Sequence, residues 1–182
     1  GGNTLQEGRL AELGNSIMAL PSMQRGRALD EARRNAVSIF EPEIRSQRVR
    51  IREDERGLVI SLASDGFFEP ATADINLEET RQVFEKLSTL LGSEQLEGRK
   101  FRIEGHTDSI PTDPNGPWES NWDLSVARAL NVFRLLQDYG VDEEQFQVMG
   151  LADTVPLFSN DTAEGRAYNR RVDVIILTEG HL

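Results

Sequence analysis

Residues 103–129 read IEGHTDSIPTDPNGPWESNWDLSVARA and contain the transition that decides the fold. The stretch begins as a strand that ends in Thr107 and Asp108, continues through a connection rich in proline and glycine, and becomes helical from Asn121. A strand, a long connection and a helix start bring polar side chains together at one end of a sheet, where folds of helices and strands keep their sites. We therefore expect the functional groups of this chain beyond the end of the strand Lys100–Gly105.

The helix that follows is expected to present two stripes of side chains. At 100° per residue, one stripe holds Asn121, Leu124, Ser125 and Arg128, and a second, expected to be the core stripe, holds Trp122, Val126, Ala129, Leu130, Phe133 and Leu136. The first stripe brings Arg128 toward Asp108. These two groups can pair as a structural salt bridge, or they can hold a zwitterionic ligand, with the carboxylate binding an ammonium and the guanidinium a carboxylate. Asn121 is also a good helix N-cap.

The rest of the chain supplies a sheet and a second helix. Alternation of apolar residues predicts a hairpin of strands around Val49–Ile51 and Leu58–Leu62, and helical spacing predicts a helix over Asn76–Leu91. The helix from Asn121 extends to Tyr139, and two further strands, Phe146–Met149 and Arg171–Leu177, complete the order ββαβαββ. The predicted fold class is an α/β (α+β) sandwich, in which helices pack on one face of a mixed β-sheet.

The first 47 residues differ from the rest. Residues 1–56 carry 10 basic and 9 acidic side chains, whereas residues 57–182 carry 10 and 22. Apolar residues at 3-4-3 spacing predict two amphipathic helices, marked by Leu10, Leu13, Ile17 and Leu20, then by Leu29, Ala32, Ala36 and Ile39. We therefore expect a helical arm, residues 1–47, and a folded domain, residues 48–182. The apolar faces of the arm are expected either to dock on the domain or to associate with a second copy.

Composition excludes several classes of function. A net charge of −11 argues against nucleic acid as a partner, because phosphates need basic side chains. With no cysteine and only two histidines, a metal site would need unusual ligands, so we expect no metal, no cofactor and a hydrogen-bonding role for His106. Glu104 and Asp108 could be proposed as a glycosidase pair, but one strand exit carries both, and no nucleophile elbow or phosphate loop is present. Catalytic residues are therefore not expected.

Four ordered motifs carry a resemblance to a known family. Gly105–Asp108, Ser120–Ala129, Gly150 with Pro156, and Asn160–Val172 together resemble the OmpA C-terminal-like peptidoglycan-binding domain over about residues 57–178. The long proline-rich connection after Asp108 and the Asn-Trp-Asp-Leu-Ser sequence are more similar to the periplasmic part of MotB-type flagellar stator proteins than to porins or Pal lipoproteins.

The resemblance implies non-catalytic binding of peptidoglycan, with the diaminopimelate of the stem peptide held between Asp108 and Arg128. Thr107, Asn121 and Arg170 match family positions that support the ligand. In the cluster of Arg166, Arg170 and Arg171, we expect one side chain to reach the ligand and the others to pair with carboxylates. This chain departs from the family at Pro70-Ala71, where a polar residue is common, which leaves a ligand contact from that loop in doubt.

The resemblance also implies where the protein works. A stator-like chain is periplasmic and dimeric, tethered to the inner membrane by an upstream transmembrane helix that this chain lacks, and that upstream segment contacts a membrane partner subunit. The chain starts Gly1-Gly2-Asn3, as expected of a fragment or a processed product. Three alternatives remain at this point: the peptidoglycan-binding tail of an outer-membrane lipoprotein or porin, a cell-wall hydrolase, and a domain used only for protein association.

Overall fold

The computed structural model of the protein describes residues 29–179. Its centre is one five-stranded sheet in the order β1-β2-β5-β3-β4. The strands are β1 (Val49–Asp54), β2 (Gly57–Ala63), β3 (Phe101–His106), β4 (Phe146–Gly150) and β5 (Arg171–Leu177). Only β3 and β4 are parallel, and all other pairs are antiparallel. The sheet is therefore mixed, as predicted.

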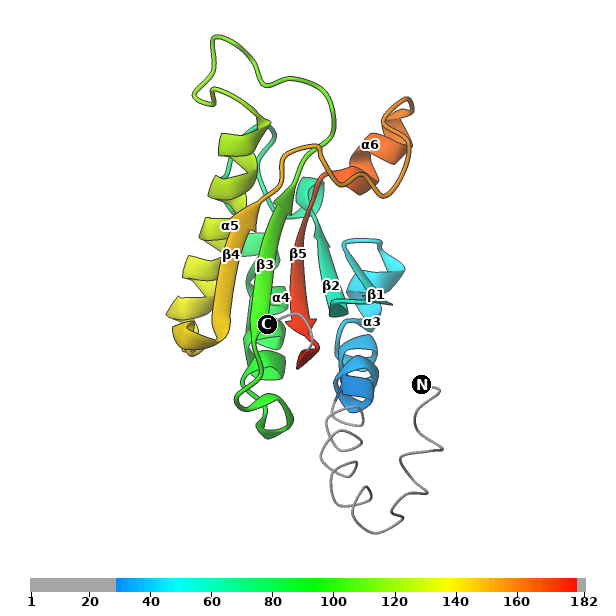
Figure 1. Ribbon diagram of the computed structural model, residues 1–182, viewed down its shortest axis with the longest axis vertical. Coiled ribbons are helices and arrows are strands. Elements are labelled where there is room, and N and C mark those ends of the chain that lie inside the picture. Colours follow the sequence, from blue (N-terminus) through cyan, green and yellow to red (C-terminus); the bar gives the residue numbers. More distant parts are fainter. Residues whose placement is uncertain (1–28, 180–182) are drawn as a thin grey trace, which may run out of the picture.

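Two long helices, α4 (Leu77–Leu91) and α5 (Asn121–Asp138), cover one face of the sheet (Figure 1). Their apolar side chains share a single core with the inward residues of the strands, among them Phe84, Val132, Ile60, Ile103 and Val174. Burial of this apolar surface is the main stabilising term for the domain. The predicted sandwich is confirmed.

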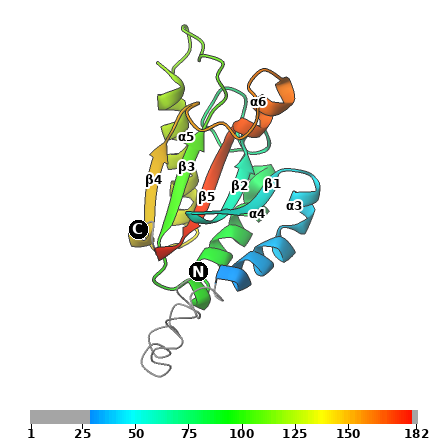
Figure 2. The same ribbon diagram turned by 45° about the vertical axis from the view of Figure 1, so that its right-hand side comes forward.

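The shorter elements are α3 (Glu41–Arg45), α6 (Ala163–Asn169) and three 3-10 turns, Ser64–Gly66, Glu94–Leu96 and Glu143–Gln145. Helix α6 was not predicted, because its seven residues carry no apolar stripe. It lies beyond the sheet, between β4 and β5 in the chain, on the same side of the molecule as the long connection before α5 (Figures 1 and 2).

The described end of the arm is helical at residues 29–39 and packs on the domain. Ala32, Ala36 and Phe40 are fully buried in the same core as the sheet. For this second helix of the arm, docking on the domain is what the structure shows. The expected first helix, marked by Leu10 to Leu20, lies outside the described residues, and the division at residue 48 stays a prediction.

The face of α5 that contacts the sheet differs in part from the prediction. Ala129 and Leu136 are buried as predicted and Phe133 packs against the core, whereas Trp122 and Val126 are about half exposed. The other buried residues of the helix are Leu124, Ser125, Arg128 and Val132. The cause is a close approach: a Cβ added to Gly105 would lie 2.0 Å from the Ser125 carbonyl oxygen, and one added to Gly150 would lie 2.4 Å from the Val126 nitrogen. Small residues on both sides let the helix backbone approach the strands, so Ser125 and Arg128 face inward.

Candidate functional site: a charged pocket beyond strand β3

The five predicted site residues line one pocket of about 320 Å³. Thr107 and Asp108 follow β3 directly, Asn121 and Arg128 lie in the first two turns of α5, and Arg170 lies between α6 and β5. The pocket is walled further by the connection between β3 and α5, residues 109–119, and by Ala71. Groups from four separated segments thus converge at one end of the sheet, as the strand order requires.

Helix α5 begins one residue earlier than the Asn121 cap suggested. The N-cap is Ser120, whose hydroxyl accepts from the Trp122 nitrogen, while the Asp123 carboxylate accepts from the Ser120 nitrogen in a capping box. Asn121 is free of that role. Its side-chain amide donates to the carbonyl oxygens of Ile110, at 3.0 Å, and Asp108, at 3.4 Å, so it holds the start of the connection against the helix.

Asp108 pairs with Arg170 and not with Arg128. Its Oδ2 lies 2.7 Å from Arg170 Nη1, and its Oδ1 accepts from the Ile110 nitrogen at 3.0 Å. Arg170 also donates to both carboxylate oxygens of Asp65, each at 2.9 Å. These carboxylates raise the pKa of Arg170, so it is a permanent cation. Asp65 and Arg170 therefore orient Asp108 toward the pocket.

Arg128 is a buried cation without a carboxylate partner among residues 29–179. It is 5% exposed, its Nε donates to the Thr72 carbonyl oxygen at 2.7 Å, and its guanidinium lies 4.9 Å from the centre of the Phe68 ring. Burial lowers the pKa of Arg128 to about 10, although the charges of Asp65 and Asp108 partly oppose that effect. The guanidinium lines the pocket with its charge uncompensated by a direct ion pair.

Two features of the site were not found in the sequence. Asp65, in the turn after β2, has no motif of its own, although its place directly beyond a buried strand is a usable signal. The loop after β2 contributes its backbone in place of the polar side chain common in the family: the Ala71 carbonyl accepts from Trp118 Nε1 and the Thr72 carbonyl from Arg128. Ala71 adopts φ 59°, a left-handed conformation that aims this segment at the pocket.

The other members of the predicted set have structural bonds. Thr107 donates through its hydroxyl to the Asp108 carbonyl oxygen at 2.8 Å, which shapes the chain where it leaves β3. Of the arginine cluster, only Arg170 lines the pocket. Arg171 donates to Asp173 and Arg166 to the Asn160 carbonyl oxygen.

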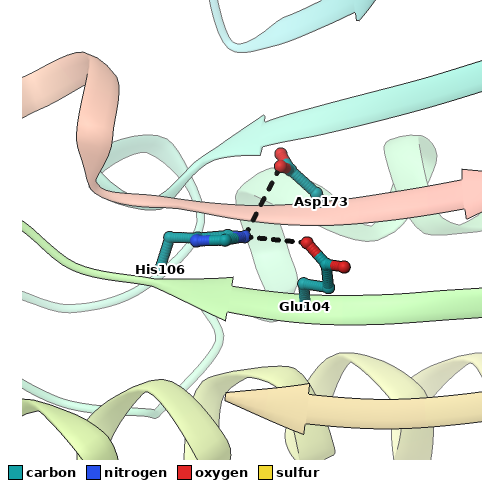
Figure 3. Close-up of side chains that lie close together, drawn as sticks. All are labelled: Glu104, His106 and Asp173. Atoms are coloured by element: carbon teal, nitrogen blue, oxygen red, sulfur yellow. Dashed lines mark hydrogen bonds and ion pairs between the residues drawn. The ribbon is translucent and has the colours of Figure 1, made fainter. Parts of the chain in front are cut away.

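A second group of titratable residues, Glu104, His106 and Asp173, lies on the sheet face away from the long helices (Figure 3). His106 Nε2 is 3.0 Å from Glu104 Oε1 and 3.7 Å from Asp173 Oδ2. One nitrogen and two carboxylates within reach of each other resemble a metal-ligand set.

The carboxylates of this group already have cationic partners. Arg56 Nη1 donates to both oxygens of Glu104 at 2.7 Å, and Arg52 and Arg171 each donate to Asp173 at 3.0 Å. A metal ion would have to displace these arginines or lie beside them, which its charge opposes. The group therefore fits a network of paired charges better than a metal centre. The Glu104 carboxylate is bonded within this network, so it is unavailable as the general acid of a glycosidase.

Comparison with known proteins shows the family. The OmpA family model matches residues 67–170. The chain belongs to the OmpA family. It is 39% identical to Motility protein B of Bacillus subtilis over 125 residues, which are 68% of this chain and 46% of that protein. The chain spans about half the length of these curated relatives.

Solved structures extend the similarity to most of the chain. A MotB-like protein from Desulfovibrio vulgaris superposes with a TM-score of 0.75 at 25% identity, covering 87% of this chain and 98% of that one. The cell wall anchor of the T6SS from Pseudomonas aeruginosa gives 0.66 at 28% identity, covering 78% and 96%. The resemblance to the OmpA family and to MotB periplasmic domains is confirmed. Within residues 29–179, no helix has the length and apolar composition to cross a membrane.

Proposed function

We propose that this OmpA-family domain binds peptidoglycan without catalysis, by holding the diaminopimelate of the stem peptide between Asp108 and Arg128. The observation that carries the proposal is the Arg128 guanidinium, which is buried at the pocket and has no carboxylate partner among the described residues. Burying a charge without a partner is costly, so a ligand carboxylate would compensate it.

The charges around the pocket fit a zwitterion. Asp65 and Asp108 offset Arg128 and Arg170, so a ligand of zero net charge leaves these four groups balanced. Asp113 of the connection also lines the pocket and adds one negative charge. The free end of the diaminopimelate side chain carries an ammonium and a carboxylate on one carbon atom. Its carboxylate would take the place opposite Arg128 as a forked pair, and its ammonium would join Arg170 at Asp108.

Single contacts of this kind give weak binding. A hydrogen bond to a charged group contributes about 1.5–3 kcal/mol, and ordering a flexible ligand offsets much of that. A homodimer on a polymeric wall would turn the second binding event into an intramolecular one and raise the overall affinity. The proposal therefore includes a second copy of the chain.

The similarity to Motility protein B supports a more specific role: anchoring a flagellar motor stator to the cell wall. In this role the domain lies in the periplasm, and a transmembrane segment outside this chain tethers it to the inner membrane and contacts the membrane partner subunit. The similarity to the T6SS cell wall anchor supports the same wall-binding function in a different machine.

Co-sedimentation with insoluble peptidoglycan tests the proposal. Wild type is expected in the pellet, whereas Asp108→Asn and Arg128→Ala are expected in the supernatant with unchanged circular dichroism. Arg134→Ala and Asp138→Ala, on exposed positions of the same helix, are the matched controls and should sediment like wild type. Sedimentation of folded Asp108→Asn and Arg128→Ala would refute the site. Clearing of a peptidoglycan suspension by the wild type would instead indicate a hydrolase.

A further inference from the structure

The spacing between Asp108 and Arg128 is not set by a bond between the two side chains. Among the described residues, Asp108 pairs with Arg170, whereas Arg128 donates to the Thr72 carbonyl oxygen. The two charges also come from different elements, because Asp108 follows β3 and Arg128 belongs to α5. Their spacing therefore depends on the contacts that fix α5 against the end of β3.

Ser125 makes one of these contacts. It lies on the buried face of α5, about one turn before Arg128, and is 1% exposed. Its hydroxyl donates to the Trp122 carbonyl oxygen of its own helix at 2.9 Å and accepts from the Ala152 nitrogen at 3.1 Å. Gly150 leaves the space for this hydroxyl, since a Cβ there would lie 2.6 Å from Ser125 Oγ. The bond to Ala152 ties the helix to the chain that leaves β4.

Ala152 continues the connection to β3. The chain after β4 passes the end of β3 on its way to α6 (Figure 1), and the Ala152 carbonyl oxygen accepts from the Thr107 nitrogen at 2.8 Å. Ala152 has φ 51°, a left-handed conformation that is costly for a residue with a Cβ and persists only where the surroundings fix it. Its N–H bonds to α5 and its carbonyl to the residue before Asp108. Ser125, Ala152 and Thr107 thus form a bridge between the two charges, called the Ser125 bridge below.

We propose that Ser125 is a positioning residue, which sets the spacing between Asp108 and Arg128 and so makes the pocket specific for an ammonium and a carboxylate on one carbon atom. This inference rests on the proposed function and adds the residue that determines its specificity. Covalent geometry fixes the separation of the two ligand charges, so both are bound only where the protein charges are placed to match. A ligand that carries the ammonium alone has no such requirement.

Asn121 supplies a second bond between α5 and the end of β3, but a weaker one. Its side-chain amide lies 3.4 Å from the Asp108 carbonyl oxygen, at the partly exposed start of the helix. The Ser125 bond is shorter and fully buried, and removing the hydroxyl leaves the Ala152 nitrogen without its acceptor. Because an unpaired buried N–H is costly, the loop after β4 is expected to shift when the hydroxyl is absent. Arg128 then changes its distance from Asp108, and a ligand bound at both charges loses one of them.

Two synthetic peptides test the Ser125 bridge, L-Ala-γ-D-Glu-meso-diaminopimelate and L-Ala-γ-D-Glu-L-Lys, titrated into the folded chain and followed by NMR. The lysine peptide lacks only the carboxylate at the free end of the side chain. Wild type is expected to bind the diaminopimelate peptide at least about tenfold more tightly, because of the contact with Arg128. Ser125→Ala is expected to reduce this preference to about threefold or less, with the affinity for the lysine peptide kept.

Two further variants complete the test. Ser125→Cys keeps a side chain of similar size but offers only a weak acceptor, so its preference is expected to lie between those of wild type and Ser125→Ala. Ser88→Ala is the matched control, because the Ser88 hydroxyl also donates to a carbonyl oxygen of its own helix, that of Glu85 at 3.0 Å, and lies on α4 away from the pocket. It should keep the wild-type preference.

The outcomes separate the role of Ser125 from the proposed function. If folded Ser125→Ala keeps the wild-type preference, or weakens the binding of both peptides by the same factor, the positioning role is refuted while binding at Asp108 and Arg128 stands. If Ser125→Ala does not fold, Ser125→Cys decides, and an unchanged preference in that variant refutes the role. If the folded wild type binds neither peptide, the proposed function fails as well.

Discussion

Replacing Arg128 by methionine should stabilise the free domain while abolishing its binding to peptidoglycan. The guanidinium is almost fully buried and has no carboxylate partner among the described residues, and burial lowers its pKa to about 10. A folded pKa below the unfolded value means that the charged form is disfavoured by folding. At pH 7 the side chain is protonated in both states, so the full cost is present there.

The size of the effect follows from that shift. Lowering the pKa from the ordinary arginine value to about 10 corresponds to about 3 kcal/mol of unfavourable free energy. Methionine removes this cost but also loses the charge-assisted bond to the Thr72 carbonyl oxygen, worth about 1.5–3 kcal/mol, and keeps a favourable contact with Phe68. The net gain expected is up to about 1.5 kcal/mol, or a rise in Tm of up to about 5 °C for a domain of this size.

Urea denaturation followed by circular dichroism measures this difference, and co-sedimentation with peptidoglycan measures the loss of binding. Arg170→Met is the control of opposite sign, because Arg170 pairs with Asp65 and Asp108, and its removal should cost about 1–3 kcal/mol. If Arg128→Met lowers stability by 1 kcal/mol or more, as Arg170→Met should, then Arg128 is already compensated in the free domain. The argument for a ligand carboxylate would then be refuted.

Two further predictions concern the scaffold of the site. Burial raises the pKa of Glu104, but hydrogen bonds from His106 and Arg56 outweigh that effect and hold the pKa below its ordinary value. The stabilisation of the folded state by the ionised Glu104 is therefore present above the unfolded pKa, about 4.3, and is lost as pH falls through the folded pKa. Tm measured from pH 7 to 3 should fall more steeply for wild type than for Glu104→Gln, and parallel curves would contradict the network. Gly105→Ala should lower the free energy of unfolding, measured by urea denaturation, by about 3 kcal/mol or more, because its Cβ would lie 2.0 Å from the Ser125 carbonyl oxygen. In the control Gly66→Ala, the Cβ meets only a flexible arginine side chain at 3.4 Å, so the loss should be under about 1 kcal/mol. Equal losses in the two variants would show that the close approach of α5 is not required.

The strands and the long helices were predictable because their signals are local. Alternation at Leu58, Ile60 and Leu62 identifies the face of β2 that lies in the main core, and the stripe of α4 identifies its contact with the sheet. The gathering of Asp108, Arg128 and Arg170 was also predictable, from a strand end, a helix start and the family motifs. The pairing of Asp108 with Arg170 was not, because 62 residues separate them and only the strand order places β5 beside β3.

The face of α5 shows why hydrophobicity alone misleads. A stripe drawn through Trp122 and Val126 selects large apolar residues that are exposed, yet the buried face includes Ser125 and Arg128. Ala129 and Leu136 of the predicted stripe are buried as expected. Size decides here, since a helix that approaches the strands at Gly105 and Gly150 has no room for a large side chain between them. The sequence does carry a signal for the buried face of α5, namely a small residue on the helix and a glycine on each of two strands. These residues can be recognised as facing one another only when the strand pairing is known.

The two faces of the sheet contribute differently to the site. The core beneath α4 and α5 is apolar and non-directional, so it holds β3 in the sheet without setting the orientation of the polar groups at its end. On the other face, directional bonds tie Glu104 of β3 to Arg56 and to His106, which immediately precedes Thr107 and Asp108. A weak ligand held by two charged contacts depends on where those charges are placed, because small displacements cost much of their interaction. The buried ion network therefore serves the pocket by fixing the strand end from which Asp108 emerges.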